Sequence, residues 1–124
     1  MATTIYGTYQ TDGSANPISL NVEVGFAQLG ATSVTIDGVP KVESGADSNG
    51  IYRENFNINL GPNSALKGKL LEVTSKVNIL KLPANSSLTI NIAGTAPQGY
   101  GMDNPSTGVG VGDVIEYYAS ITFL

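Results

Sequence analysis

The chain has 124 residues, a length that suits one domain with a single core. It contains no Cys, His or Trp, which excludes disulfides, thiolate or imidazole metal sites, and catalysis by a Cys nucleophile or a Ser–His pair. Only 13% of the residues are charged and the formal net charge is -4 at pH 7 without a basic stripe, so the composition argues against partners that are nucleic acids or anionic membranes.

The composition also favours strands over helices. The chain has 15 Gly and 6 Pro, which disfavour helices, while 41% of its residues are hydrophobic, enough for a core. No apolar run is long enough to span a membrane, so we expect no membrane insertion. The first residues lack a basic segment followed by an apolar stretch, so we expect no signal peptide in this chain and a cytoplasmic location in the producing cell, unless a leader was trimmed.

Alternating apolar and polar residues predict the strands of the first half of the chain. A first strand is expected over residues 3–9. The next strand has a predicted buried face formed by Ile18, Leu20, Val22, Val24 and Phe26. A third strand, with Val34 and Ile36 inward, is expected to end at an Asp37–Gly38 hairpin turn, and Pro40 favours an edge position for the short strand that follows.

The second half of the chain repeats this pattern four times. The residues expected to face the core are Phe56, Ile58, Leu60, Leu71, Val73, Ser75, Val77, Ile79, Leu88, Ile90, Ile92, Ile115, Tyr117, Ala119, Ile121 and Phe123. We therefore predict an all-β fold, a single antiparallel β-sandwich of about seven or eight strands that occupies residues 1–124. Immunoglobulin-like, C2-like and jelly-roll topologies all fit the pattern, because strand order is not local information.

A Gly-rich segment over residues 94–112 shows no strand pattern and is expected to be a long loop. Its centre holds an aromatic side chain beside a carboxylate and an amide, namely Tyr100, Asp103 and Asn104. Loops of this length often bind ligands, so these residues are candidates for contact with a sugar or a peptide. The alternative is an ordinary surface loop.

An acidic loop over residues 43–50 is the second candidate. Asp47 and Asn49 stand in a spacing that loosely resembles a calcium loop, although the spacing departs from the EF-hand pattern. Calcium is therefore a candidate cofactor, with Asp12, Asp103 or Asp113 as further ligands if the loops converge, and no other cofactor is expected. The alternative is that Asp47 and Asn49 are turn residues that bond their own backbone.

Two further features point to recognition. Asparagines are expected to line an outward sheet face, an unusual use of a poor strand former, at positions 21, 55, 57, 59, 78 and 91. The last strand places tyrosines on both of its faces, so Tyr118 is expected at the surface or at an interface, and Phe123 and Leu124 at the chain end need cover. Low charge on the strand edges also offers weak protection against edge pairing.

These features predict a non-catalytic structural or protein-interaction module that assembles with itself or with another protein, rather than an enzyme. Tyr118, Phe123 and Leu124 are the predicted interface residues. The alternative is a carbohydrate-binding module, with or without calcium, that uses the loops 43–50 and 94–112. Its predicted ligand-binding residues are Tyr100, Asp103, Asn104, Asp47 and Asn49.

Overall fold

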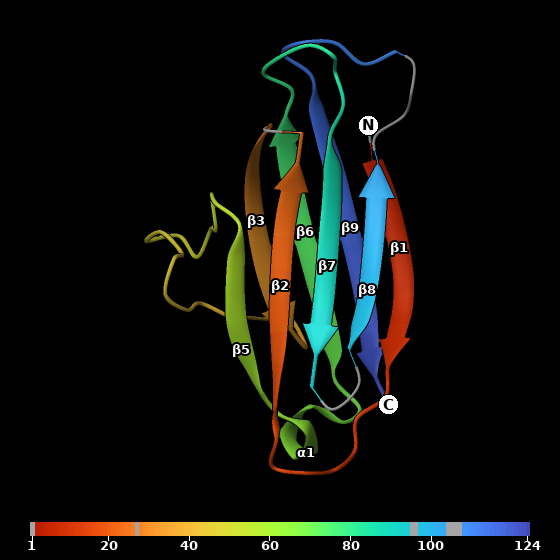
Figure 1. Ribbon diagram of the computed structural model, residues 1–124. Helices are drawn as coiled ribbons and strands as arrows, with labels where there is room; N and C mark the ends of the chain where they lie inside the picture. The colour runs from red at the N-terminus through yellow and green to blue at the C-terminus, as the bar shows by residue number, and fades with distance from the viewer. Residues whose placement is uncertain (1, 27, 95–96, 104–107) are drawn as a thin grey trace.

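The computed structural model describes residues 2–26, 28–94, 97–103 and 108–124, and they form two β-sheets stacked face to face (Figure 1). The elements in chain order are β1 (Ala2–Tyr9), β2 (Pro17–Gly25), β3 (Leu29–Ile36), β4 (Val39–Pro40), β5 (Phe56–Pro62), α1 (Asn63–Leu66), β6 (Leu70–Asn78), β7 (Ser87–Ala93), β8 (Gln98–Asp103) and β9 (Val114–Phe123). The prediction of an all-β fold is therefore confirmed. No helix among the described residues has the length and apolar character needed to cross a bilayer.

The larger sheet has the strand order β1-β9-β6-β3-β4, and the smaller sheet has the order β5-β2-β7-β8. All pairs are antiparallel except β1 with β9, which run parallel from Ala2 opposite Glu116 to Tyr9 opposite Phe123. The expectation of a wholly antiparallel sandwich was wrong at this pair, because the alternation within a strand carries no information about its direction. The choice among immunoglobulin-like, C2-like and jelly-roll topology stays a prediction.

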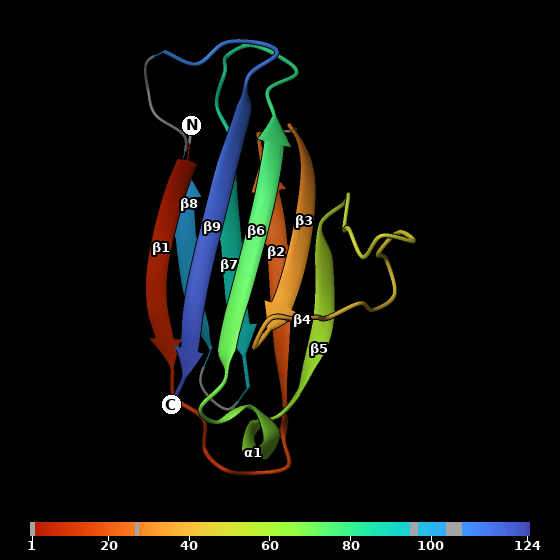
Figure 2. The ribbon, with the colours of Figure 1, turned by 180° about the vertical axis from the view of Figure 1, so that it is seen from behind.

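The two ends of the sandwich are named by their place in Figure 1. The upper end is the end at which β2, β6 and β8 terminate, and the lower end carries α1 and the C-terminus (Figure 1). Seen from behind, β1, β9, β6 and β3 lie side by side, with the short β4 beyond β3 (Figure 2). Asp37 and Gly38 join β3 to β4 with φ angles of 50° and 78°, as a two-residue hairpin turn of the predicted kind requires.

The core lies between the two sheets, and nearly all the predicted inward positions are buried in it. Val24 and Ile36 are only partly buried and pack against the core. Phe26 is an exception: its side chain is 58% exposed and its φ is 61°. The expectation of an inward Phe26 was wrong because β2 ends at Gly25 and the chain turns before the alternation reaches the next position.

The predicted loop 94–112 contains a strand, β8, so this prediction was also wrong. β8 pairs antiparallel with β7 and has Met102 buried and Tyr100 half-buried on its inner side. The neighbouring positions on the outer side are Gly99, before Tyr100, and Gly101, between Tyr100 and Met102. Glycine provides no side chain that alternates with the apolar ones, so the period-2 pattern was hidden in the sequence.

A network of hydrogen bonds closes the lower end. Asn63 is fully buried, and its side-chain Nδ2 donates to the carbonyl oxygen of Asn16 at 2.9 Å while its Oδ1 accepts from the N–H of Asp12 at 3.2 Å. The backbone of the last residue is held by the N–H of Thr11, which donates to the Leu124 carbonyl at 3.0 Å. The apolar side chains beneath this network are buried; they are Tyr9, Leu66 and Phe123.

Candidate functional site

Exposed apolar side chains gather at the upper end. Among the described residues, ten large hydrophobic side chains are exposed, and six of them lie in the loops or strand starts of this end. They are Phe26, Leu29, Leu80, Leu82, Val111 and Val114, and we call them the apolar end. Exposed apolar side chains that gather at one end of a small protein make that end a candidate interaction site.

The strand register and the loop hydrogen bonds place part of this set together. Asn78 on β6 is opposite Val114 on one side and Leu29 on the other, so these two aliphatic residues flank it on the outer face of the larger sheet. The backbone N–H of Ile79 donates to the carbonyl of Asp113 at 2.9 Å, and the N–H of Gly112 donates to the carbonyl of Ile79 at 2.9 Å. The loops that carry Leu80 and Val111 are therefore joined.

A single buried amide holds the loop after β6. The Gln28 side chain is 8% exposed, and its Nε2 donates to the carbonyl oxygens of Lys81 at 3.1 Å and Asn85 at 2.9 Å. Its Oε1 accepts from the N–H of Leu80 at 2.7 Å and from that of Lys81 at 3.4 Å. Because this amide uses both its donor and its acceptor sides, it holds the exposed leucines in a defined position.

Charges of both signs accompany the apolar end. Lys81 is exposed and forms no ion pair within the described ranges. Asp113 lies next to Val114, and its Oδ2 accepts from the N–H of Gly110 at 2.9 Å, which fixes the carboxylate beside the patch. The apolar end thus contains five aliphatic side chains and one aromatic ring. Lys81 is the basic side chain beside it, and the acidic ones are Asp113 and also Asp103, which lines a hollow together with Phe26.

Tyr118 lies on the outer face of the larger sheet, where the sequence predicted it. Its ring meets Tyr6 edge to face at 6.4 Å between centroids, and its hydroxyl donates to the Glu72 carboxylate at 2.5 Å. Because only the neutral phenol can donate this hydrogen bond to Glu72, the bond raises the pKa of Tyr118 above its ordinary value. Tyr118 is half-buried, whereas the ring of Tyr6 on the edge strand β1 is 77% exposed.

The two other predicted interface residues differ in their placement. Phe123 is fully buried and meets Tyr9 edge to face in the core. Its side chain therefore presents no surface to a partner, and the expectation that Phe123 needs outside cover was wrong: it is the last inward position of β9. Leu124 is exposed at the lower end.

The predicted sugar contacts at residues 100–104 are placed on a strand. Tyr100 is half-buried, its hydroxyl donates to the carbonyl of Thr8 at 2.6 Å, and its ring occupies the space where a side chain at Gly7 would lie. Tyr100 thus closes the gap between the edge strands β8 and β1. Asp103 is exposed at the end of β8, and Asn104 lies outside the described residues.

The predicted acidic loop is organised around Asp47. Its Oδ1 accepts from the N–H groups of Asn49 and Ile51 at 2.9 and 3.0 Å, and its Oδ2 accepts from Nε of Arg53 at 3.0 Å. The hydrogen bonds from Ile51 and Asn49 hold the pKa of the Asp47 carboxyl below its ordinary value. Asp47 acts as the turn-forming residue of its own loop.

The structure does not bring the two predicted ligand loops together. Loop 43–50 precedes β5, and β5 and β8 are the opposite edges of the smaller sheet (Figure 1). The prediction that Asp47 and Asn49 act with Tyr100 and Asp103 on one ligand was therefore wrong in its geometry. Within the described ranges, no three acidic side chains gather as a metal site would require.

The predicted asparagine face is present in part on the smaller sheet. Asn57, Asn21 and Asn91 form a row across β5, β2 and β7, and Asn91 donates to Asn21 at 3.5 Å. Asn78 lies on the larger sheet and does not belong to this row. Asn55 has a separate role, because its Oδ1 accepts from the N–H of Val24 at 2.9 Å.

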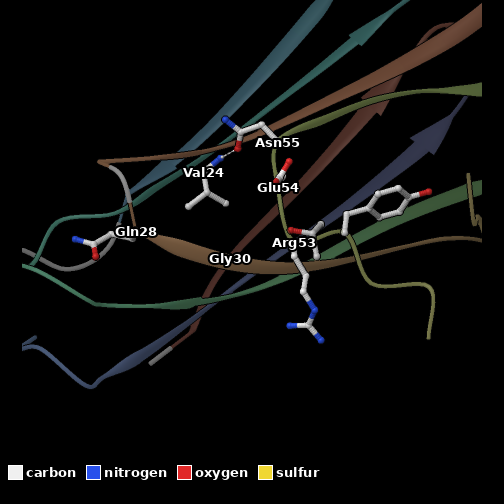
Figure 3. Close-up of a pocket in the computed structure, with 8 residues that line it drawn as sticks. Val24, Gln28, Gly30, Arg53, Glu54 and Asn55 are labelled. Atoms are coloured by element: carbon white, nitrogen blue, oxygen red, sulfur yellow. Dashed lines mark hydrogen bonds between the residues drawn. The ribbon is translucent and has the colours of Figure 1, made fainter. Parts of the chain in front are cut away.

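A cleft opens between the sheets where the chain crosses from β3 to β5 (Figure 3). It has a volume of about 280 Å³. Its walls come from the end of β2, the start of β3 and the segment before β5, and the lining residues are Val24, Gln28, Gly30, Thr32, Tyr52, Arg53, Glu54 and Asn55.

Comparison of the chain with protein-family models, with curated proteins and with solved structures finds no match. The site is therefore defined by geometry alone. Sequence reasoning missed the apolar end and the cleft. A usable signal was present for Val111, because this aliphatic residue lies in the segment 94–112 that the sequence predicted to be a loop.

Proposed function

We propose that the protein is a non-catalytic interaction module that self-associates through its apolar end. The observation that carries this proposal is the concentration of six exposed apolar side chains on one end of the sandwich. Removing such side chains from water favours association at roughly 25 cal/mol per Å² of buried apolar surface, before the costs of association.

A second copy of the chain is the partner that the charges favour. Lys81 and Asp113 lie in the two joined loops of the apolar end. In a two-fold pair, the same patch of both copies meets, so the Lys81 of each copy can face the Asp113 of the other. A partner whose facing surface carries charge of one sign would repel either Lys81 or Asp113.

We assign self-association to this end rather than to Tyr118. The hydroxyl of Tyr118 is already bonded to Glu72, and most of the residue is covered. The aliphatic side chains of Leu80 and Leu82, in contrast, are 55% and 72% exposed. Burying these two leucines would stabilise a complex more than burying the Tyr118 hydroxyl, which would have to give up its hydrogen bond to Glu72.

Sedimentation velocity over a wide range of concentration tests the proposal. We expect the wild-type chain to increase in mass with concentration and the double variant Leu80→Ser, Leu82→Ser to remain a monomer. The matched control is Val39→Ser, Val42→Ser, which changes two exposed apolar residues outside the apolar end and should associate like the wild type. A wild-type chain that stays monomeric throughout, or equal association of both double variants, would overturn the proposal.

A further inference from the structure

The cleft lies at a crossover between the two sheets. Tyr52 is bound to the edge of β3 by two hydrogen bonds of 2.8 Å, in which the N–H of each of Tyr52 and Thr32 donates to the carbonyl of the other. The chain then leaves this edge and joins the smaller sheet at Phe56. The rings of Tyr52 and Phe56 stack at 4.0 Å between centroids and fix both ends of the crossover.

Above the crossover, each sheet has an edge that the chain no longer pairs. On the smaller sheet, the N–H of Val24 donates to the side chain of Asn55, which replaces a strand partner. On the larger sheet, the N–H and carbonyl of Gly30 point to the same side as those of Thr32, because groups two residues apart on a strand point the same way. No described strand pairs with Gly30 on that side.

The cleft lies beside this unpaired backbone, because Gly30 and Thr32 are among its lining residues. Gly30 is buried, and a Cβ at this position would lie 2.7 Å from Cγ2 of Val24, so a side chain here would require Val24 to move. Figure 3 shows Gly30 on its strand below Val24, Glu54 and Asn55. Pockets for small molecules usually measure about 300–1,000 Å³. The cleft volume of about 280 Å³ lies just below this range.

The mouth of the cleft carries one uncompensated negative charge. Arg53 is paired with Asp47 at 3.0 Å, and Lys41 is paired with Glu43 at 3.3 Å. Glu54 is exposed and lines the cleft, and it has no partner within the described part of the chain. A basic side chain is the natural complement of this carboxylate.

We propose that the cleft binds a short extended segment of a partner protein by strand addition at Gly30. The main chain of the segment would pair with the free N–H and carbonyl of Gly30, as in other sheet-edge complexes. A Lys or Arg of the segment would pair with Glu54. This site is separate from the apolar end, so it does not depend on the proposed self-association.

Selection from a phage-displayed library of random peptides of about seven residues tests this site. We expect the wild-type chain to enrich peptides with a Lys or Arg, and the Glu54→Lys variant to lose at least about tenfold in recovery of those peptides. Glu23→Lys is the matched control, because it makes the same charge change at an exposed position on the outer face of β2. The selected peptide, added to labelled protein, should protect the Gly30 amide from hydrogen exchange.

Three results would overturn the proposal. The first is a selection without enrichment on the wild-type chain, and the second is equal recovery by Glu54→Lys. The third is protection of the Gly30 amide that rises with protein concentration in the absence of peptide, which would assign the edge to a second copy.

Discussion

Both ends of the sandwich are held by a buried side-chain amide, and yet they differ in how many apolar side chains they expose. Each end is held by one buried side-chain amide, Asn63 at the lower end and Gln28 at the upper end. At the lower end, the apolar side chains of Tyr9, Leu66 and Phe123 lie beneath the loops. At the upper end, the loop after β6 is also held by hydrogen bonds to a buried amide, and six apolar side chains are still exposed.

This difference shows that the exposure at the upper end does not follow from a loosely held loop. Burying a polar amide costs free energy unless the amide is hydrogen-bonded. The buried amide of Gln28 forms its hydrogen bonds with N–H and carbonyl groups of the loop backbone. The loop therefore has a defined conformation, in which Leu80 and Leu82 point outward. A rigid apolar surface loses less conformational entropy on association than a mobile one.

The largest effect on stability is expected at the lower end, from Asn63→Ala. The change removes a buried amide, and with it the Asn63 acceptor of the Asp12 N–H and one donor to the Asn16 carbonyl. We expect the free energy of unfolding to fall by about 3 kcal/mol in a urea titration. The control is Asn57→Ala, an exposed asparagine, with an expected loss below about 0.5 kcal/mol. Equal losses for the two variants would contradict the role given to Asn63.

Gln28→Ala is the corresponding change at the upper end. We expect the free energy of unfolding to fall by about 2 kcal/mol, because the backbone groups of Leu80, Lys81 and Asn85 lose their partner. Self-association should weaken as well, since the leucines are no longer held in one position. Gln10→Ala, at an exposed glutamine of the lower end, should cost less than about 0.5 kcal/mol. If Gln28→Ala changes neither the free energy of unfolding nor self-association, Gln28 does not hold the upper end as Asn63 holds the lower end.

The lower end contains one buried group that its network does not satisfy. The hydroxyl of Tyr9 is buried and has no hydrogen-bond partner among the described residues. Tyr9→Phe removes this hydroxyl and is expected to raise the free energy of unfolding by up to about 1 kcal/mol. The matched change Tyr52→Phe should lower it by about 1 kcal/mol, because that hydroxyl donates to the carbonyl of Lys41 and accepts from the N–H of Glu43. Thermal unfolding that ranks the variants in the opposite order would contradict this account.

The smallest effect concerns the loop of Asp47, which is organised by a carboxylate instead of an amide. Because the folded state lowers its pKa, the stabilisation is complete above the ordinary value of 3.8 and is lost as the pH falls through the lower, folded-state pKa. We expect the amide signals of Asn49 and Ile51 to titrate with a midpoint below 3.8, and Asp47→Asn to abolish this titration. A midpoint at or above 3.8 would contradict it. The amides of Gln28 and Asn63 do not titrate, so the hydrogen bonds that they form at the two ends should not change over the same pH range.

The sequence predicted the strands well where side chains of both kinds alternate, as over Ile18 to Val22 and Ile115 to Phe123. It failed where glycine replaces one half of the pattern, which hid β8. The prediction also failed at Phe26, because the alternation of apolar residues continues to this position in the sequence although the chain turns there.

The candidate sites were less accessible to sequence reasoning, because they depend on strand order. Asp47 and Tyr100 lie beside the opposite edge strands of the smaller sheet, which no local pattern indicates. The apolar end joins residues from β3, β9 and three loops. The unpaired edge at Gly30 exists only because the chain changes sheets after Tyr52. Composition indicated low charge on the surface, but it did not indicate where the apolar side chains gather.

Intermolecular spin-label contacts test the central claim most directly. The chain has no cysteine, so Asn85→Cys at the upper end and Lys67→Cys at the lower end each provide a single attachment point. A spin-labelled chain is mixed with an isotope-labelled, unmodified chain at high concentration. We predict that the label at position 85 broadens the amide signals of Leu80, Leu82 and Val111 in the other copy, while the label at position 67 does not. Equal broadening by both labels, or none by either, would contradict self-association through the apolar end.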